Sequence, residues 1–121
     1  MKSILLIEDD PFLIDIYTTK IKEAGFSVEV AEDGEKALRK IKEKIPDIIL
    51  LDIVLPRVDG WEILKEMKEK KELKNSKIVI LSNLGQKEEV EKGLKLGATK
   101  YLIKAHYTPS QVIEEIKKII K

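Results

Sequence analysis

Five short apolar runs alternate along the chain with five longer segments in which apolar residues recur at helical spacing. This alternation is typical of repeated strand and helix units, in which helical crossovers join parallel strands. The runs that predict strands are residues 3–8, 26–31, 47–52, 77–82 and 100–103. The pattern therefore predicts an α/β fold with one parallel sheet of five strands and five helices.

The composition of each run indicates its place in the sheet. Residues 3–8, 47–52 and 77–82 are apolar nearly throughout, as strands covered by helices on both faces must be. Residues 26–31 alternate apolar with polar side chains, and residues 100–103 are few and flanked by lysines, so we expect both at the edges. Because parallel crossovers are right-handed, the order 2-1-3-4-5 satisfies these constraints. This is the doubly wound, flavodoxin-like arrangement.

Local signals predict where the helices begin and end. Asp10 is expected to cap a helix that starts at Pro11 and ends at Gly25. Thr108 and Gln111 have the spacing of a capping box at the start of the last helix. Each helix is expected to bury one apolar stripe, including Ala37, Leu38, Ile41 and Ile45 in the second helix and Val90 and Leu94 in the fourth.

Length and composition exclude several classes of protein. The chain has 121 residues, close to the commonest size of one domain, so we expect residues 1–121 to form a single domain with no output domain. A net charge of +1 argues against direct binding of nucleic acid. The first apolar run meets acids too early for a signal peptide or membrane span, so we expect no membrane insertion and a cytoplasmic location. The absence of cysteine excludes disulfides and thiolate chemistry.

Polar side chains follow the strands at the point where each apolar run ends. Glu8 and Asp9 follow the first run, Asp52 ends the third, Ser82 ends the fourth and Lys104 follows the fifth. Ligands of such sheets bind beyond the carboxyl ends of the strands, where the winding reverses. We therefore expect these five side chains to converge on one site.

The chemistry of these groups indicates phosphoryl transfer. Crowded carboxylates raise one another's pKa unless a cation lies between them, and Mg²⁺ prefers oxygen ligands while keeping waters that a substrate can replace. With Mg²⁺ and Lys104 neutralising phosphoryl oxygens and Ser82 donating to one of them, Asp52 can attack phosphorus and form an aspartyl phosphate. The sequence thus predicts Mg²⁺-dependent phosphorylation of Asp52.

With these residues the chain resembles the receiver domain of two-component response regulators. The motifs that match are LLIEDD, ILLDIVLPRVDG, VILS and LGATKYLIK, and the resemblance covers essentially the whole chain. It implies that Asp52 is the phosphoacceptor and Asp9 a direct Mg²⁺ ligand. Glu8 would act mainly through bound water, and the main-chain carbonyl of Val54 would complete the protein ligands.

The resemblance also implies a switch and its partners. Ser82 would move toward the phosphoryl group, Lys104 would pair with it, and Tyr101 would turn inward. A histidine kinase or phosphotransfer protein would supply the phosphoryl group, and a downstream effector would bind the face formed by the fourth helix, fifth strand and fifth helix. We expect a monomer before phosphorylation and allow for a dimer after it. We also expect slow self-dephosphorylation rather than the activity of a conventional enzyme.

The sequence departs from the family pattern in three respects, at four positions. Ala105 follows Lys104 where the family usually has a cis proline; because a cis bond without proline costs about 2.5 to 4 kcal/mol, we expect a trans bond, which puts the reach of Lys104 in question. Asn83 replaces a small residue and either crowds the phosphoryl pocket or donates to it. Val54 and Leu84 are apolar at the positions that tune the attacking water, so we expect a long-lived phosphoryl group.

One other function fits the sequence, and a second is excluded by it. Charged residues make up 37% of the chain, against roughly 25% in an average domain, and most of the excess is Lys and Glu. This suits an idealised or engineered flavodoxin-like scaffold that keeps the acids without acting as a switch. A phosphatase of the haloacid dehalogenase type would need Asp-x-Asp after the nucleophile strand, where the sequence reads DIVLP.

Overall fold

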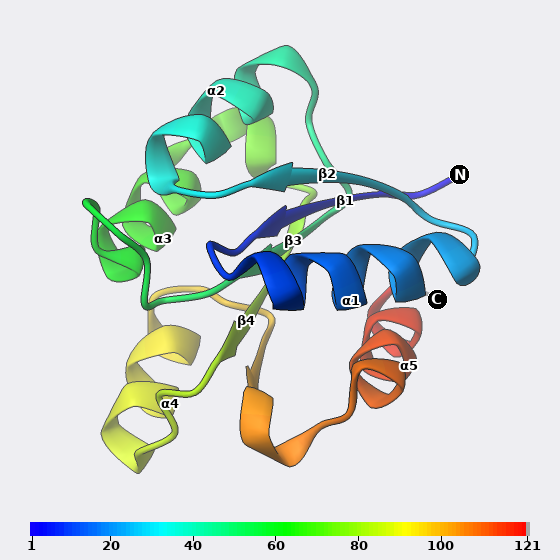
Figure 1. The fold of residues 1–121 in the computed structure, drawn as a ribbon. Coiled ribbons are helices and arrows are strands. Elements are labelled where there is room, and N and C mark those ends of the chain that lie inside the picture. Colours follow the sequence, from blue (N-terminus) through cyan, green and yellow to red (C-terminus); the bar gives the residue numbers. More distant parts are fainter. Residues whose placement is uncertain (121) are drawn as a thin grey trace.

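Five parallel strands form the centre of the molecule in the computed structural model, which describes residues 1–120 (Figure 1). The strands are β1 (Ser3–Ile7), β2 (Ser27–Ala31), β3 (Ile48–Leu51), β4 (Lys77–Ser82) and β5 (Lys100–Ile103). They lie side by side in the order β2-β1-β3-β4-β5, which confirms the predicted doubly wound sheet and its edge strands. The winding reverses between β1 and β3, so the acids that follow these two strands are neighbours.

Helices cover both faces of the sheet. They are α1 (Pro11–Glu23), α2 (Gly34–Glu43), α3 (Gly60–Glu69), α4 (Lys87–Lys95) and α5 (Pro109–Ile119), with short 3₁₀ turns at Lys71–Leu73 and Lys104–His106. The first and last helices pack on one face, and α2 and α3 pack on the other (Figure 1). The predicted α/β architecture with five helices is therefore confirmed.

Side chains along each central strand alternate between two apolar cores. In β1, Ile4 and Leu6 pack beneath α1 and α5, whereas Leu5 and Ile7 pack beneath α2 and α3. All four residues of β3 are buried. Because each fully buried Ile or Leu contributes about 1.5 to 3 kcal/mol, β1 and β3 form a rigid support for the residues that follow them.

The predicted helix signals act as expected. The Asp10 carboxylate accepts hydrogen bonds from the amides of Phe12 and Leu13 and caps α1, and Gly25 has a positive φ of 92° just after that helix. Thr108 and Gln111 form the reciprocal capping box of α5. These caps satisfy amide groups that the first turn of a helix leaves without partners.

Two predicted apolar stripes are wrong in part. The second helix ends at Glu43, and Ile45, 42% exposed, lies in the turn before Pro46, where a residue preceding proline avoids helical geometry. Within α4 only Gly93 is buried, while Leu94 is 46% exposed. The bare α-carbon of Gly93, rather than an apolar stripe, brings α4 close to the sheet.

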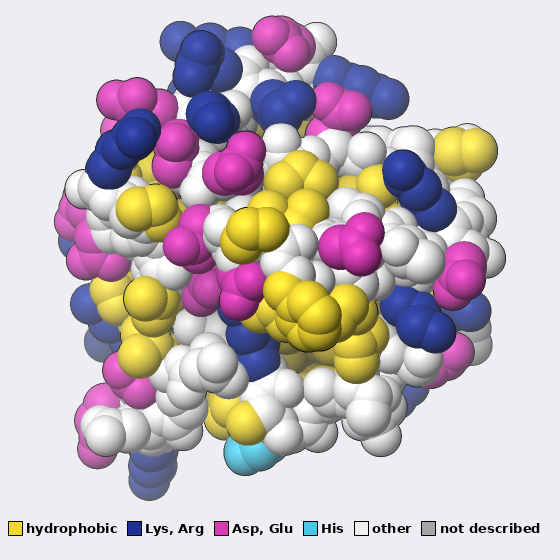
Figure 2. All heavy atoms as spheres, viewed as in Figure 1, with side chains coloured by type: hydrophobic (Ala, Val, Ile, Leu, Met, Phe, Trp, Pro, Cys, Tyr) yellow, Lys and Arg dark blue, Asp and Glu magenta, His cyan; other side chains and the backbone are white. Residues whose placement is uncertain are grey.

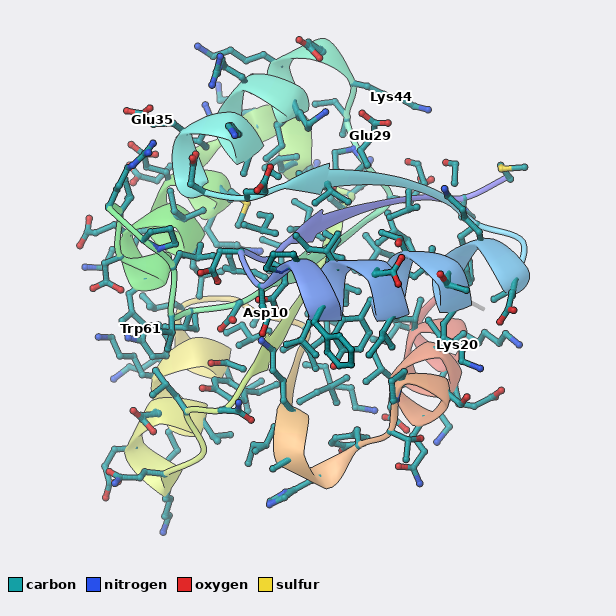
Figure 3. The ribbon with its side chains drawn as sticks, in the orientation of Figure 1. Asp10, Lys20, Glu29, Glu35, Lys44 and Trp61 are labelled. Atoms are coloured by element: carbon teal, nitrogen blue, oxygen red, sulfur yellow. The ribbon has the colours of Figure 1, made fainter. Side chains whose placement is uncertain are left out.

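Charges of both signs are interspersed on the molecular face shown in Figure 2, with hydrophobic side chains gathered near α1. Phe12 at the start of α1 is 72% exposed. Figure 3 shows Asp10 at the start of α1 and Trp61 at the start of α3, both toward the end of the sheet where the strands finish. Among residues 1–120, none of the helices has the length and apolarity that crossing a membrane requires.

Candidate functional site

Glu8 and Asp52 lie at the ends of adjacent central strands. The hydrogen-bond ladder continues one residue beyond the strands, because the Glu8 amide donates to the Ala31 carbonyl at 3.0 Å and the Asp52 amide donates to the Ile7 carbonyl at 3.1 Å. Glu8 is 2% exposed and Asp52 is 6% exposed. The sheet thus fixes two acidic side chains side by side in a nearly buried position.

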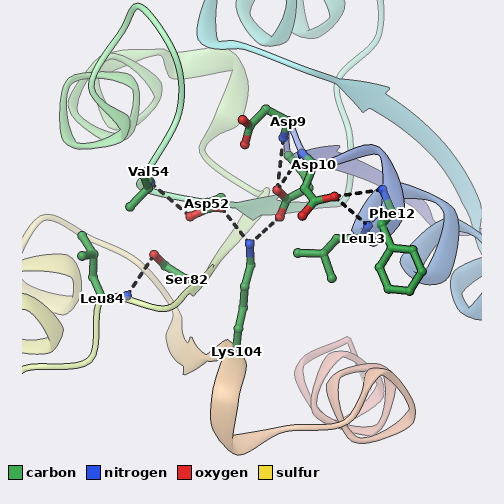
Figure 4. Close-up of polar contacts among 10 residues, drawn as sticks. Asp9, Asp10, Phe12, Leu13, Asp52, Val54, Ser82, Leu84 and Lys104 are labelled. Carbon is green, nitrogen blue, oxygen red and sulfur yellow. Dashed lines mark hydrogen bonds and ion pairs between the residues drawn. The ribbon is translucent and has the colours of Figure 1, made fainter.

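Asp9 completes a cluster of three carboxylates (Figure 4). Glu8, Asp9 and Asp52 each offer one oxygen, and these oxygens all lie within 4.8 Å of one another. The amides of Asp9 and Asp10 donate to Oε2 of Glu8 at 3.2 and 3.1 Å, which holds the turn after β1 around that carboxylate. Since Asp9 is exposed, the cluster is open to solvent on its side.

Lys104 reaches both buried acids. Its Nζ lies 2.6 Å from Oε1 of Glu8 and 2.8 Å from Oδ2 of Asp52 (Figure 4). No peptide bond among the described residues is cis, so the trans bond expected between Lys104 and Ala105 is confirmed. A 3₁₀ turn begins at Lys104, and the Lys104 side chain is only 10% exposed. The absence of proline after Lys104 does not shorten its reach.

Burial and pairing have opposite effects on the charges of this group. Burial raises the pKa of Glu8, although the hydrogen bonds from Lys104 and from the Asp10 amide partly offset it. Burial alone would lower the pKa of Lys104, but its hydrogen bonds to Asp52 and Glu8 outweigh burial and raise that pKa. One ammonium therefore stands among three carboxylates, and the cluster keeps an excess of negative charge.

The donor set fits a hard divalent cation. All side-chain donors are carboxylate oxygens, the exposed Asp9 leaves room for water ligands, and the excess negative charge favours a further cation. The chain has no cysteine and its single histidine, His106, is exposed in the turn after β5, as expected. The usual nitrogen and sulfur ligands of zinc are thus missing from the cluster.

Ser82 and Tyr101 are joined through the main chain of Leu84. The Ser82 hydroxyl is fully buried and accepts a hydrogen bond from the Leu84 amide at 3.3 Å. The Tyr101 hydroxyl donates to the carbonyl of Leu84 at 2.5 Å, and burial raises the pKa of Tyr101 to about 12. Ser82 and Tyr101 therefore contact the two peptide groups on either side of the Leu84 α-carbon.

Comparison with known proteins identifies the family of a chain with this fold and site. Residues 4–117 match the response regulator receiver domain. The chain belongs to this family. The receiver is 34% identical over 121 residues to the chemotaxis protein CheY of Thermotoga maritima, covering 99% of this chain and 98% of that protein.

Other relatives of the receiver include longer proteins. It is 34% identical to the alkaline phosphatase synthesis transcriptional regulatory protein PhoP of Bacillus subtilis, covering 99% of this chain but only 49% of PhoP. The chain thus spans about half the length of such relatives. The solved chemotaxis protein CheY4 of Vibrio cholerae superposes with a TM-score of 0.91 at 26% identity, covering 98% of both chains.

The remaining predicted site residues differ in their contacts and exposure. The Val54 amide donates to Oδ1 of Asp52 at 3.1 Å, while the Val54 side chain is 58% exposed (Figure 4). Leu84 is half-buried against the core beneath α2 and α3, and Asn83 is exposed. The receiver therefore presents Val54, rather than Leu84, to solvent beside Asp52.

Two contacts of the loops that follow the strands were not predicted from the sequence. One is the Leu84 link described above, which depends on how the loop after β4 folds. The other is an ion pair of 3.5 Å between Arg57, in the loop after β3, and Asp33, in the loop after β2. The PRVDG segment contains Arg57, but its sequence alone does not indicate a partner 24 positions earlier in the chain.

Proposed function

We propose that this receiver accepts a phosphoryl group on Asp52 from the phosphohistidine of a histidine kinase or phosphotransfer protein, and that phosphorylation switches its binding to an effector. The environment of Asp52 carries this proposal. Its Oδ2 pairs with Lys104 at 2.8 Å, its Oδ1 accepts from Val54, and two more acids adjoin it. A buried carboxylate held in this way is oriented as a nucleophile rather than as a helix cap.

The proposed transfer exchanges one bond to phosphorus for another. A carboxylate oxygen of Asp52 forms a bond to phosphorus as the phosphorus–nitrogen bond of phosphohistidine breaks, and the bonding electron pair stays on the imidazole nitrogen. The Lys104 ammonium, already beside Asp52, would neutralise a phosphoryl oxygen. The product is an acyl phosphate on Asp52.

Glu8, Asp9, Asp52 and the main-chain carbonyl of Val54 would hold Mg²⁺. When bound, Mg²⁺ neutralises the carboxylates and the phosphoryl oxygens. Support comes from the converging oxygens of the three acids. The solved response regulator Rcp1, 26% identical over 98% of this chain with a TM-score of 0.86, is a Mn²⁺-bound form.

The switch would start at Ser82. To donate to a phosphoryl oxygen, its hydroxyl would turn toward Asp52 and weaken the contact with the Leu84 amide. Because Tyr101 binds the carbonyl of Leu84, this motion would reach Tyr101 and the surface formed by α4, β5 and α5. Phosphorylation would then bias an existing equilibrium between two conformations, which an effector distinguishes.

Phosphorylation with a small donor tests the proposal. The protein is incubated with acetyl phosphate, with and without Mg²⁺, and analysed by intact mass spectrometry. We expect one Mg²⁺-dependent phosphoryl group, lost in Asp52→Asn and retained in Asp15→Asn, which changes an exposed aspartate of α1. No modification of the wild-type protein, or modification that persists in Asp52→Asn, would instead support the scaffold interpretation.

A further inference from the structure

The loop between β3 and α3 contains a strained residue. Arg57 has a φ of 67°, and among the described residues it is the one non-glycine residue with a positive φ. Side chains with a β-carbon rarely adopt this conformation, whereas glycine and asparagine tolerate it more readily. Arg57 lies three positions after Val54 in the same loop, and the Val54 amide contacts Asp52.

The side chain of Arg57 contacts the turn between β2 and α2. Its Nη1 lies 3.5 Å from Oδ2 of Asp33, and the other oxygen of Asp33 accepts a hydrogen bond from the Lys36 amide at 2.9 Å. Asp33 caps α2 and its side chain is 9% exposed, whereas the Arg57 side chain is 74% exposed. A nearly buried carboxylate in one loop thus pairs with an exposed arginine in another.

Close backbone packing holds the ends of this loop. The Gly60 amide donates to the Ile53 carbonyl at 3.1 Å, and a β-carbon on Gly60 would lie 2.4 Å from the Ile53 α-carbon. A β-carbon on Gly34 would lie 3.5 Å from that of Val58, so the loop also packs against the start of α2. The segment around Arg57 is the strained part between these contacts.

We propose that Arg57 is a positioning residue for metal binding: its pair with Asp33 holds the loop in the conformation that places the main chain of Val54 beside Asp52. This inference rests on the proposed function, which assigns the Val54 carbonyl to Mg²⁺. It gives a specific reason for an arginine at a position whose backbone favours glycine or asparagine. Val54 already donates its amide to Asp52, so a shift of the loop would disturb the proposed ligand and the acceptor together.

Arg57→Gln separates positioning from simple electrostatics. Glutamine keeps a long side chain and the strain of the positive φ but lacks the charge that pairs with Asp33, so we expect stability to urea equal to or slightly below that of the wild-type protein. Removing a positive charge near an acidic site would by itself tighten binding of a cation. Loss of positioning would instead weaken binding of the cation. Since exposed ion pairs contribute modestly, we expect the Kd for Mg²⁺ to rise about two- to fivefold.

The test is a titration with MgCl₂ at constant ionic strength, followed by the fluorescence of Trp61, the single tryptophan, and independently by the thermal midpoint. Asp33→Asn keeps a helix-capping side chain but lacks the ionic partner, and its Kd should also rise. The double variant Arg57→Gln with Asp33→Asn should bind Mg²⁺ no more weakly than Asp33→Asn alone, because both changes remove the same pair. Arg39→Gln, which removes an exposed arginine of α2, is the matched control and should not weaken binding.

Unchanged or tighter Mg²⁺ binding by Arg57→Gln would overturn the positioning role while leaving the proposed function intact. An equal weakening in Arg39→Gln would also overturn it, because the effect would then not depend on the pair. A wild-type protein that binds no Mg²⁺ would refute the metal site of the proposed function and this inference with it.

Discussion

Lys104 is the residue on which the charge of the site depends. Its ammonium bridges two carboxylates that are each almost buried, and removing it would leave both without a cationic partner. Buried ion pairs are weak evidence for stability, because desolvation offsets most of the attraction. The geometry is better explained by a role at the site, where one ammonium orients Glu8 and Asp52 before the proposed phosphoryl transfer.

Glu8 should give the metal-free protein an unusual dependence on pH. Burial raises its pKa in the folded state above the ordinary value of 4.5. This contribution to stability is fully present below pH 4.5 and is lost as pH rises through the raised pKa, because the folded state must then bury a charge. In Glu8→Gln, we expect the free energy of unfolding to fall less between pH 4.5 and 7, as measured by urea titration in EDTA.

Two comparisons isolate this effect. Glu43→Gln changes an exposed glutamate at the end of α2 and should retain the slope of the wild-type protein. The pKa values of Asp33, Asp47 and Glu115 are lowered, chiefly by hydrogen bonds to the carboxylates, so their contributions are lost as pH falls and lie below this window. Equal slopes for the wild-type protein and Glu8→Gln would contradict the prediction.

Val54 should determine how long the phosphoryl group lasts. Its exposed apolar side chain stands beside Asp52 and offers no group to orient an attacking water. We expect Val54→Asn to shorten the half-life of phospho-Asp52 roughly tenfold, less than the 10²- to 10⁴-fold that a positioned acid or base supplies. Decay after removal of acetyl phosphate, followed by mass spectrometry, measures the half-life.

Ile45→Asn provides the control, because Ile45 is also exposed and apolar but lies in the turn between α2 and β3. It should leave the half-life unchanged. Leu84→Glu should also shorten the half-life, but because Leu84 packs against the core, this variant is expected to lose stability as well. An unchanged half-life in both Val54→Asn and Leu84→Glu would refute the role of these side chains.

At the scale of elements, α4 is the helix least fixed by apolar packing. Its single buried residue is Gly93, and its Lys92 lies 4.5 Å from the centre of the Trp61 ring on α3. Such contacts allow α4 to shift without opening a core, which suits a helix whose position would respond to Tyr101. The packing of Gly93 against Tyr101 is therefore where α4 should be most sensitive to substitution.

Gly93→Ala should destabilise the protein although alanine favours helices. The new β-carbon would lie 2.6 Å from Cδ1 of Ile80 and 2.8 Å from Cδ2 of Tyr101. Overpacking of this kind costs about 1 to 3 kcal/mol, more than the roughly 0.5 to 1 kcal/mol gained by replacing a helical glycine. Urea unfolding measures the loss of stability, which should be smaller in a background where Tyr101→Ala has removed the ring. As a control, Lys95→Ala on the exposed side of α4 should have little effect. A Gly93→Ala protein as stable as the wild type would contradict the close packing of Gly93 against Ile80 and Tyr101.

The elements that sequence could predict are those whose burial leaves a direct pattern. β1, β3 and β4 read as continuous apolar runs because helices cover both faces, and Asp10 is recognisable as a cap because only local atoms are involved. Gly93 of α4 could not be identified in this way, because its burial depends on side chains from β4 and β5. The apolar Leu94 consequently suggested a buried stripe that the helix does not have.

At the scale of the whole molecule, the same distinction applies to the site. Parallel topology brings the ends of all strands to one edge, so the convergence of Glu8, Asp52 and Lys104 followed from the strand order. The links through Leu84 and between Arg57 and Asp33 depend on loop conformations that apolar patterns do not encode. Sequence thus predicts which groups meet, whereas structure is needed to see what holds them in position.

Because the carboxylates converge only in the folded chain, Mg²⁺ should stabilise the whole domain. An ion that binds the native state alone, at ten times its Kd, adds about 1.4 kcal/mol, which corresponds to roughly 3 to 8 °C in the thermal midpoint of a domain this size. Calorimetry with MgCl₂ against NaCl of equal ionic strength measures the shift. Asp9→Asn should abolish it, since Asp9 belongs to the cluster.

The neighbouring acid provides a sharp control for this shift. Asp10 caps α1, and Asp10→Ala should lower the free energy of unfolding by about 1 kcal/mol through loss of that cap. Its Mg²⁺ shift should nevertheless remain close to that of the wild-type protein, because Asp10 lies outside the cluster of Glu8, Asp9 and Asp52. A specific Mg²⁺ site should depend on Asp9 and not on the adjacent Asp10. If the shift in the thermal midpoint persisted in Asp9→Asn, or vanished equally in Asp10→Ala, Mg²⁺ would be acting as a general counter-ion.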